Sequence, residues 1–236
     1  MQDSAQHLPD GYLLRLMEEG DYPEIAAICA VVYPTERPYT HDELASHHTR
    51  FPMGQFVVEH VASGLVAGAH FTLRIDLLHF HLDDSWDTLT AGGSFDDHDP
   101  DGHTLYGADL FVHPDHQHHG IGRALTDATR ALVRAERLWR MVGGSRMPGY
   151  GKLAAQCAPQ EYLARVRRAE LVDPVLTAHL HDGWDAVTVV QGYLPNDAES
   201  AGWAAVIQWV NPEYSLSPEA ELDISNIQRR GDPSGT

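Results

Sequence analysis

The sequence predicts an α/β fold, in which helices flank a central sheet. At its centre, the apolar and β-rich run Leu105–Val112 is joined by a short glycine segment to a helical pattern from Arg123 to Arg137. The preceding residues give the order strand, helix, helix, strand, strand, and the following residues give further short strands and a helix. This mixed order, in a chain of 236 residues, is typical of an α/β domain with a substantial core.

Five elements precede the central strand. An apolar run followed by a polar exit marks the first strand, and Asp21 is positioned to cap the helix that comes next. Thr40 and Glu43 have the spacing of a capping box, which predicts the start of a second helix. Two β-rich runs around Ala62-Ser63-Gly64 then predict a hairpin. These elements are the strand Tyr12–Met17, the helix Pro23–Val32, the helix after Thr40, and the strands Gln55–Val61 and Leu65–Asp76.

Four elements follow the central helix, and a polar tail follows them. They are the strand Met141–Met147, the helix Pro159–Leu171, and the strands Val187–Gly192 and Trp203–Val210. The tail is polar enough that we expect it to be loosely ordered. We therefore expect one domain over residues 1–214, with an acidic, histidine-rich insertion at 77–104 and the tail at 215–236.

The insertion is longer than a usual hairpin connection, and long loops in compact domains tend to be functional or disordered. Asp97–Gly102 matches the opening of a calcium loop, but Ala108 stands where that loop needs a bidentate glutamate. His79 and His81 lie close together without the spacing of a four-ligand site. We expect a solvated acidic loop and assign no metal ligand, and a metal-dependent enzyme built on the insertion stays open as an alternative.

Composition restricts the partners and the compartment. The formal net charge is −18, and Lys152 is the only lysine. Such a surface repels nucleic acids and anionic membranes. No apolar run is long enough to span a membrane, and no signal-peptide pattern is present. Cys29 and Cys157 are isolated, which is typical of a reducing compartment. We expect an acidic cytoplasmic protein with neither nucleic acid nor membrane as a partner.

The segment Gln117–Gly122 carries the first functional signal. A helix N-terminus has unpaired N–H groups and a positive dipole end, so it favours a phosphate-bearing ligand, and glycines let the backbone approach that ligand closely. The spacing is neither G-x-x-x-x-G-K-[ST] nor G-x-G-x-x-G. This counts against a nucleoside triphosphatase and against a dinucleotide-binding unit.

The pattern Gln117-x-x-Gly120-x-Gly122, which follows a strand ending in Val-His-Pro and precedes an Ala/Leu-rich helix, resembles the acetyl-coenzyme A loop of the GNAT N-acetyltransferase superfamily. The resemblance covers most of the chain. It implies a mixed, mostly antiparallel central sheet that is splayed at the cofactor and flanked by helices.

Within that superfamily, the second half is most similar to the N-acetyltransferase domain that is often fused to a carbon–nitrogen hydrolase. Four segments carry this similarity, namely Gly144–Tyr150, Asp173–Leu176, Gly192–Pro195 and Trp209–Pro212. A separate hydrolase as a partner stays open.

The resemblance implies that acetyl-coenzyme A is the co-substrate. Backbone groups of Leu110, Phe111 and Val112 would hold its pantetheine arm and polarise its carbonyl. The N–H groups that would hold the pyrophosphate are those of Gln117, His118, His119, Gly120, Ile121, Gly122 and Arg123.

Acetyl transfer from a thioester to an amine needs a base for the amine and an acid for the departing thiolate. Asp109 is the only carboxylate in the central strand, and burial would raise its pKa toward that of a useful base. Counting back from the loop as in the family reaches Tyr106 instead. The family's tyrosine acid precedes a Gly-Phe pair by four residues, but here His179 precedes Gly183-Trp184. Tyr150 is a further candidate acid, and water chains stay open.

Arg146 and Tyr150 follow the strand expected beside the cofactor, so we expect them to orient an acidic or polar acceptor. The alternative for Arg146 is an ion pair with a surface acid, and Asp109 has the same alternative with an arginine.

The sequence thus predicts an enzyme that moves an acetyl group from acetyl-coenzyme A to a small-molecule or peptide amine by direct attack. Two alternatives stay open, a non-catalytic acyl-coenzyme A sensor and the metal-dependent enzyme described above. A homodimer is compatible with the fold, although no residue demonstrates one.

Overall fold

The structure is a computed structural model that describes residues 8–76, 80–81 and 84–215. The predicted tail therefore lies outside the described residues except for Ser215, and so do Leu77, Leu78, His79, Leu82 and Asp83 of the insertion. None of the helices in the described ranges combines the length and the apolar character needed to cross a membrane.

In the described part of the chain, seven strands form one sheet in the order β1-β2-β3-β4-β5-β7-β6. Every neighbouring pair is antiparallel except β4 and β5. This is the mixed, mostly antiparallel sheet that the sequence predicts. The strands are β1 (Tyr12–Leu16), β2 (Gln55–His60), β3 (Leu65–Ile75), β4 (Thr104–Val112), β5 (Arg140–Arg146), β6 (Asp185–Gln191) and β7 (Trp203–Val210).

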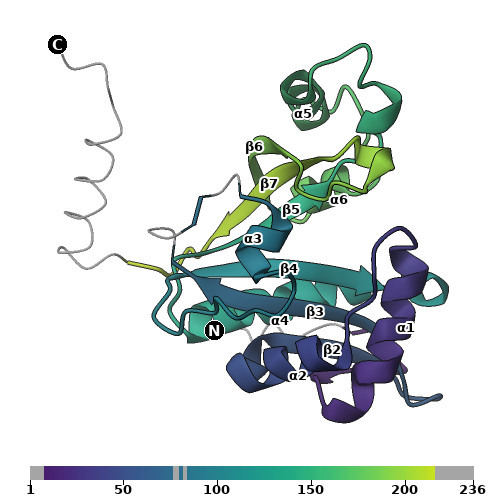
Figure 1. The fold of residues 1–236 in the computed structure, drawn as a ribbon, viewed down its shortest axis with the longest axis vertical. Helices are drawn as coiled ribbons and strands as arrows, with labels where there is room; N and C mark the ends of the chain where they lie inside the picture. The colour runs from purple at the N-terminus through teal and green to yellow at the C-terminus, as the bar shows by residue number, and fades with distance from the viewer. Residues whose placement is uncertain (1–7, 77–79, 82–83, 216–236) are drawn as a thin grey trace.

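The sheet splays between β4 and β5. The two strands pair only from Thr104 with Arg140 to Gly107 with Gly143. Beyond this point β4 stays paired with β3 and β5 stays paired with β7, so the two halves of the sheet diverge in a V (Figure 1). The sequence prediction of a sheet splayed at its centre is confirmed.

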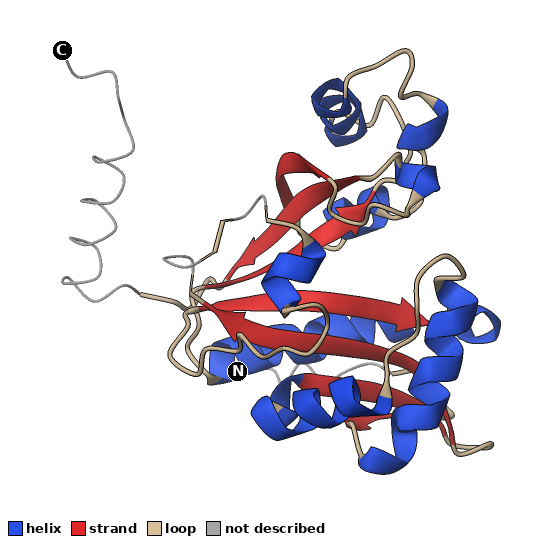
Figure 2. Ribbon diagram, viewed as in Figure 1, coloured by secondary structure: helices blue, strands red, loops and turns tan. Residues whose placement is uncertain are grey.

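Helices cover both faces of the N-terminal half. In Figure 2 the helices α1 and α2 lie in front of β2, β3 and β4, and α4 lies behind them. The helix α5 packs on β6, and α6 contacts β5 and β6. The helices are α1 (Tyr22–Val32), α2 (His41–Arg50), α3 (Trp86–Thr90), α4 (Ile121–Ala135), α5 (Pro159–Arg167) and α6 (Leu176–His181).

The two predicted helix caps have different outcomes. The Thr40 side chain accepts a hydrogen bond from the Glu43 N–H, and the Glu43 carboxylate accepts one from the Thr40 N–H, so the capping box is confirmed. Asp21 precedes α1 but makes no side-chain capping hydrogen bond to it. Its carboxylate instead accepts from both terminal nitrogens of Arg15 at 2.7 and 2.8 Å, because an arginine is a stronger donor than a helix N–H.

A β-bulge interrupts β4 at Ala108. Phe71 of β3 pairs with Asp109 and the next residue, Thr72, pairs with Gly107, so Ala108 has no partner in β3. One extra residue reverses the alternation of side chains along a strand. Tyr106 and Asp109 therefore lie on the same face of the sheet, the face covered by α1, although they are three positions apart.

Two elements were not predicted from the sequence, namely α3 inside the insertion and α6 before β6. Ser85 caps α3 by accepting from the Thr88 N–H, which marks the insertion as ordered at this point. In the calcium-like segment, His98 accepts from the Arg74 N–H and stacks on Phe51. Among the described residues, no group of three His, Cys, Asp or Glu side chains is arranged to hold a metal ion.

Candidate active site

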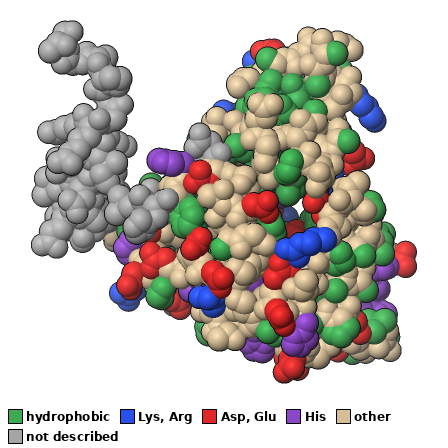
Figure 3. All heavy atoms as spheres, viewed as in Figure 1, with side chains coloured by type: hydrophobic (Ala, Val, Ile, Leu, Met, Phe, Trp, Pro, Cys, Tyr) green, Lys and Arg blue, Asp and Glu red, His purple; other side chains and the backbone are tan. Residues whose placement is uncertain are grey.

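A cleft of about 660 Å³ opens where β4 and β5 diverge. Its walls come from the loop after α1, the outer half of β4, the end of β5, the helix α6 and the loop after β6. Figure 3 shows the corresponding hollow between the two halves of the molecule, with acidic and basic side chains beside it. Because the splay leaves one edge of β4 without a strand partner, this wall presents free backbone groups to the cleft.

The predicted pantetheine-binding residues lie on that wall. Leu110, Phe111 and Val112 line the cleft, and none of them has a partner in β5. Gln117 also lines it, and its side-chain amide donates to the Val112 carbonyl at 3.3 Å. A chain with amide and carbonyl groups therefore finds here an open strand edge with which to pair.

The loop predicted to bind the pyrophosphate continues from Gln117, beyond the residues that line the cleft. Gly120 is the N-cap of α4 with a φ of 78°, and no side chain caps the helix. A Cβ at Gly120 would meet nothing within 4 Å, so space beside this residue is open. The first N–H groups of a 15-residue helix are thus available to an anion. His118, His119 and Gly120 are exposed, Ile121 is buried beneath the loop, and Gly122 is half-buried.

Arg123 follows directly on the first turn of α4. It is 77% exposed, and with the described residues it makes only long ion pairs, at 3.8 Å with Asp127 and 4.0 Å with Asp182. Such exposed pairs contribute little, so the guanidinium remains available to a phosphate.

Asp109 lies in the cleft, on the face of β4 that the bulge turns toward α1. The Tyr33 hydroxyl donates to its Oδ1 at 2.8 Å. Burial raises the pKa of Asp109 from 3.8 to about 7, although the hydrogen bond from Tyr33 acts in the opposite direction. Among the described residues it has no ion-pair partner. A carboxyl group that titrates near neutrality in a cleft has the properties of a general base.

His179 lies on the opposite wall, on α6. Its Nδ1 and the Ser145 hydroxyl form a 3.0 Å hydrogen bond, and its ring packs edge-on against Trp184. Burial lowers the pKa of His179 to about 4, so the imidazole is neutral at pH 7. It therefore carries no imidazolium proton under these conditions.

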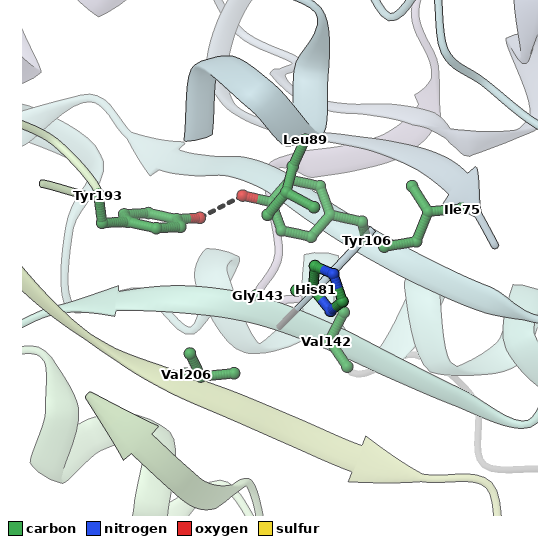
Figure 4. A pocket seen from close by; sticks show the side chains of 8 residues that line it. All are labelled: Ile75, His81, Leu89, Tyr106, Val142, Gly143, Tyr193 and Val206. Atoms are coloured by element: carbon green, nitrogen blue, oxygen red, sulfur yellow. Dashed lines mark hydrogen bonds between the residues drawn. The ribbon is translucent and has the colours of Figure 1, made fainter. Parts of the chain in front are cut away.

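Tyr106 lies behind the cleft, at the point of the V. Its hydroxyl forms a hydrogen bond with that of Tyr193, which comes from the loop after β6 (Figure 4). Tyr193 lines the cleft, and a small cavity of about 10 Å³ lies beside the pair, lined by both tyrosines and Leu89. A Cβ at Gly144 would meet the Tyr193 ring at 2.1 Å, so only glycine admits this ring against β5.

The two remaining predicted residues are held by the protein itself. Tyr150 is 4% exposed, does not line the cleft, and donates to the Cys157 carbonyl at 3.3 Å. Arg146 lines the cleft, but its guanidinium contacts Asp197 at 2.8 and 2.6 Å and Glu199 at 3.0 Å. Arg146 thus forms an ion pair with acids of the protein, which is the alternative that the sequence left open.

Sequence reasoning missed several residues of the cleft. Tyr33, Glu36 and Tyr39 come from the loop after α1, and Trp86 comes from the insertion. The indole N–H of Trp86 donates to the Ala108 carbonyl at 2.9 Å, which satisfies the bulge. Tyrosines beside prolines in a loop between two helices were the available signal, because exposed loops rarely hold aromatic rings without a reason.

Comparison with known proteins agrees with this geometry. Residues 33–143 match the model of the acetyltransferase (GNAT) family. The chain is 33% identical over 182 residues to the uncharacterised N-acetyltransferase YkwB of Bacillus subtilis (strain 168), covering 77% of this chain and 79% of that one. It is also 32% identical over 202 residues to the probable hydrolase YhcX of the same organism. That match covers 86% of this chain but only 39% of YhcX.

Solved structures share the fold. The GphF GNAT-like decarboxylase in complex with isobutyryl-CoA superposes with a TM-score of 0.70 at 25% identity, over 84% of this chain and 99% of that chain. The loading GNATL domain of CurA from Lyngbya majuscula superposes with a TM-score of 0.68 at 20% identity, over 85% of this chain and 98% of that chain. The putative acetyltransferase yncA from Salmonella typhimurium was solved with its cofactor acetyl-CoA. It superposes with a TM-score of 0.51 at 18% identity, over 88% of this chain and 98% of that chain. By its relatives, its sheet and its splayed cleft, the chain belongs to the GNAT acetyltransferase family of acyltransferase enzymes.

Proposed function

We propose that this protein transfers the acetyl group of acetyl-coenzyme A to an amine by direct attack of the amine on the thioester. The observation that carries the proposal is Asp109, a carboxyl group with a pKa of about 7 in a cleft beside the free edge of β4. The co-substrate fits the site, because that edge offers backbone groups to the pantetheine arm and the uncapped start of α4 offers N–H groups to the pyrophosphate.

Asp109 accepts the proton of the attacking amine, either directly or through one water. The backbone groups that face the cleft at the free edge of β4, between Leu110 and Val112, orient the thioester and polarise its carbonyl. Burial raises the pKa of Tyr193 above its usual range, so its hydroxyl stays protonated and is a proton donor for the departing thiolate. The hydrogen bond between the two hydroxyls lets Tyr106 stabilise the tyrosinate that forms on Tyr193, until water in the cleft returns a proton to Tyr193. His179 and Tyr150 remain further candidates for the acid.

The acceptor is a small molecule or a peptide, which are the two kinds of substrate that the family's members serve. The cytoplasmic location, the homodimer and a separate hydrolase partner stay proposals. A binding protein without turnover is the alternative that the first experiment addresses.

Calorimetric titration with acetyl-coenzyme A and with free coenzyme A, at low and high salt, tests the proposal first. We expect binding of both ligands, weaker at high salt because the phosphates contribute charge. Thiol release in the presence of a panel of amines then tests turnover. Binding without thiol release for any amine would favour the sensor, and absence of binding would overturn the proposal.

A second candidate function is decarboxylation of a carboxyacyl-coenzyme A. It is favoured by the 25% identity and the TM-score of 0.70 with a GNAT-like decarboxylase, together with the neutral, buried His179 across the cleft from β4. Incubation with malonyl-coenzyme A, followed by mass spectrometry of the thioester, separates the two functions. Loss of carbon dioxide without an amine would favour decarboxylation, and an unchanged malonyl group would favour acetyl transfer.

A further inference from the structure

The acceptor side of the cleft contains two arginines, and acids of the protein neutralise both. Arg37 contacts both oxygens of Glu43, at 2.8 and 2.5 Å. Arg146 contacts Asp197 and Glu199. Each guanidinium is thus already matched by a bidentate carboxylate, so neither provides a free positive charge for the carboxylate of a substrate.

Three carboxylates line the same region without a matching cation. Asp109, Glu36 and Asp87 all line the cleft, and none of them forms an ion pair among the described residues. Asp87 lies close enough to raise the pKa of Arg37, which Glu43 already neutralises. The acceptor side therefore has an excess of negative charge, and a cleft lined by one sign of charge concentrates ligands of the other sign.

Glu36 has unused hydrogen-bonding capacity. Its Oε1 is buried and has no hydrogen-bond partner in the described part of the chain. Its Oε2 accepts only a long, 3.4 Å bond from the Asn196 side chain, which reaches across from the loop after β6. A buried carboxylate oxygen without a donor costs free energy, and a donor cation in the cleft would offset that cost.

Tyr39 is a second polar group in the cleft with spare hydrogen-bonding capacity. It lines the cleft, it is 8% exposed, and its hydroxyl makes no hydrogen bond of normal geometry among the residues that the structure describes, although it lies near enough to Asp109 to lower the pKa of that carboxyl. Its ring lies 6.4 Å from that of Trp86, which also lines the cleft. Aromatic faces beside carboxylates are the surroundings that alkylammonium groups prefer.

Tyr33 connects the second carboxylate to the proposed base. The Glu36 N–H donates to the Tyr33 carbonyl at 3.0 Å, and the Tyr33 hydroxyl contacts Asp109. The turn holds the Cα atoms of Tyr33 and Glu36 within roughly 7 Å of each other. Glu36 and Asp109 both line the cleft, so one molecule bound there can contact both carboxylates.

We propose that the acceptor is a diamine-type molecule, with the reacting amine at Asp109 and a second, positively charged amine held by Glu36, Asp87 and the rings of Tyr39 and Trp86. This inference rests on the proposed acetyl transfer and deepens it. It replaces the acidic acceptor expected from Arg146, because that arginine is neutralised by Asp197 and Glu199.

The test compares three acceptors of the same length, which differ only in the distal group: putrescine, n-butylamine and γ-aminobutyrate. We expect kcat/KM to be about 10- to 100-fold higher for putrescine than for n-butylamine, since a hydrogen bond to a charged group contributes that much to binding. We expect γ-aminobutyrate to be the poorest of the three, because its carboxylate meets like charges.

Glu36→Gln should reduce the ratio of kcat/KM for putrescine over n-butylamine by about tenfold or more. Glu19→Gln is the matched control, because Glu19 is 80% exposed just before the start of α1, at the end opposite to Glu36, and its loss should leave the ratio unchanged. Equal kcat/KM for putrescine and n-butylamine, or a preference for γ-aminobutyrate, would overturn the inference while acetyl transfer stands.

A binding measurement separates this inference from the proposed function. Putrescine is titrated calorimetrically into protein saturated with free coenzyme A, where no transfer occurs. Binding that Glu36→Gln weakens supports the diamine site even if turnover is slow. Absence of binding together with acetylation of n-butylamine contradicts the diamine site alone, and absence of acetylation of every amine contradicts the proposed function.

Discussion

The Tyr33 hydroxyl donates a 2.8 Å hydrogen bond to Oδ1 of Asp109, and this bond connects the loop after α1 to the outer half of β4. Burial raises the pKa of Tyr33 far above its usual value, so the hydroxyl remains a donor at any working pH. The bond fixes the direction in which the carboxylate faces the cleft. It also stabilises the charged form of a group that burial drives toward the neutral form.

Asp109→Asn should lower kcat by about 100-fold or more, because general-base catalysis contributes about that much. Affinity for acetyl-coenzyme A should change little, since the predicted pantetheine contacts are made by backbone groups. Steady-state kinetics and calorimetry on the same preparation check this. A variant with undiminished kcat would remove Asp109 from the role of base.

The pH profile should show the base titrating. With a pKa of about 7, Asp109 is protonated below neutrality, so kcat/KM should rise as pH increases through 7. Tyr33→Phe removes a hydrogen bond to the charged form, so the pKa of Asp109 should increase and the rising limb should move to higher pH. A limb that stays in place in Tyr33→Phe would mean that another group controls it.

Stability should fall in mild acid. Burial lowers the pKa values of His47, His70 and His179 to about 4, so the folded state binds fewer protons than the unfolded state between pH 6.5 and 4. The stability that these histidines contribute is fully present above pH 6.5 and is lost as pH falls toward 4, on the order of 1–3 kcal/mol for each.

Thermal unfolding of His70→Asn, measured across this window, checks that expectation. Asparagine keeps a polar group opposite Thr129, whose hydroxyl lies 2.9 Å from Nδ1 of His70, but it does not titrate. Its Tm should therefore fall less steeply with acid than that of the parent protein. His41→Asn, at a 66% exposed position, should follow the parent curve. Parallel curves for all three proteins would contradict the linkage.

Gly120→Glu should weaken acetyl-coenzyme A binding by at least about tenfold, because the carboxylate would lie beside the pyrophosphate at the start of α4. Gly120→Ala is the control, since both variants place a side chain on a residue with a φ of 78°. Alanine should cost about 1 kcal/mol of stability and little affinity. Calorimetry in both variants separates repulsion from backbone strain, and equal affinities would place the phosphates elsewhere.

Local patterns were enough to predict the strands and the glycine loop, and the resemblance to the GNAT superfamily supplied the order of the sheet and its splay. The spacing of Thr40 and Glu43 was sufficient to predict their capping box. The strands β1 to β7 agree with the predicted runs to within a few residues. The helix α3 escaped notice because Trp86–Thr90 is too short for a 3.6-residue period to be read. Asp21 was predicted to accept a hydrogen bond from the N-terminal N–H groups of α1, but it accepts from Arg15 instead. Capping patterns describe contacts within one helix end, so they do not predict a partner in the preceding strand.

The contacts that build the cleft join residues far apart in the chain, so sequence spacing does not predict them. The place of Asp109 within β4 was predicted from that strand alone, and the free edge of β4 was predicted from the family resemblance. The hydrogen-bond partners could not be predicted in the same way, because Tyr33 is 76 residues from Asp109 and Tyr193 is 87 residues from Tyr106 along the chain. The neutralisation of Arg146 by Asp197 depends likewise on the pairing of β5 with β7 and the loop before it.

The bulge at Ala108 determines which face of the sheet each side chain in the outer half of β4 takes. A strand has only two faces, so a single residue added to β4 decides which face each later side chain takes. Removing that residue would exchange every side chain from Asp109 to Val112 between the face covered by α1 and the face covered by α4, with no change in their order or chemistry. The position of the proposed base is thus encoded as much by the count of residues before it as by its own identity.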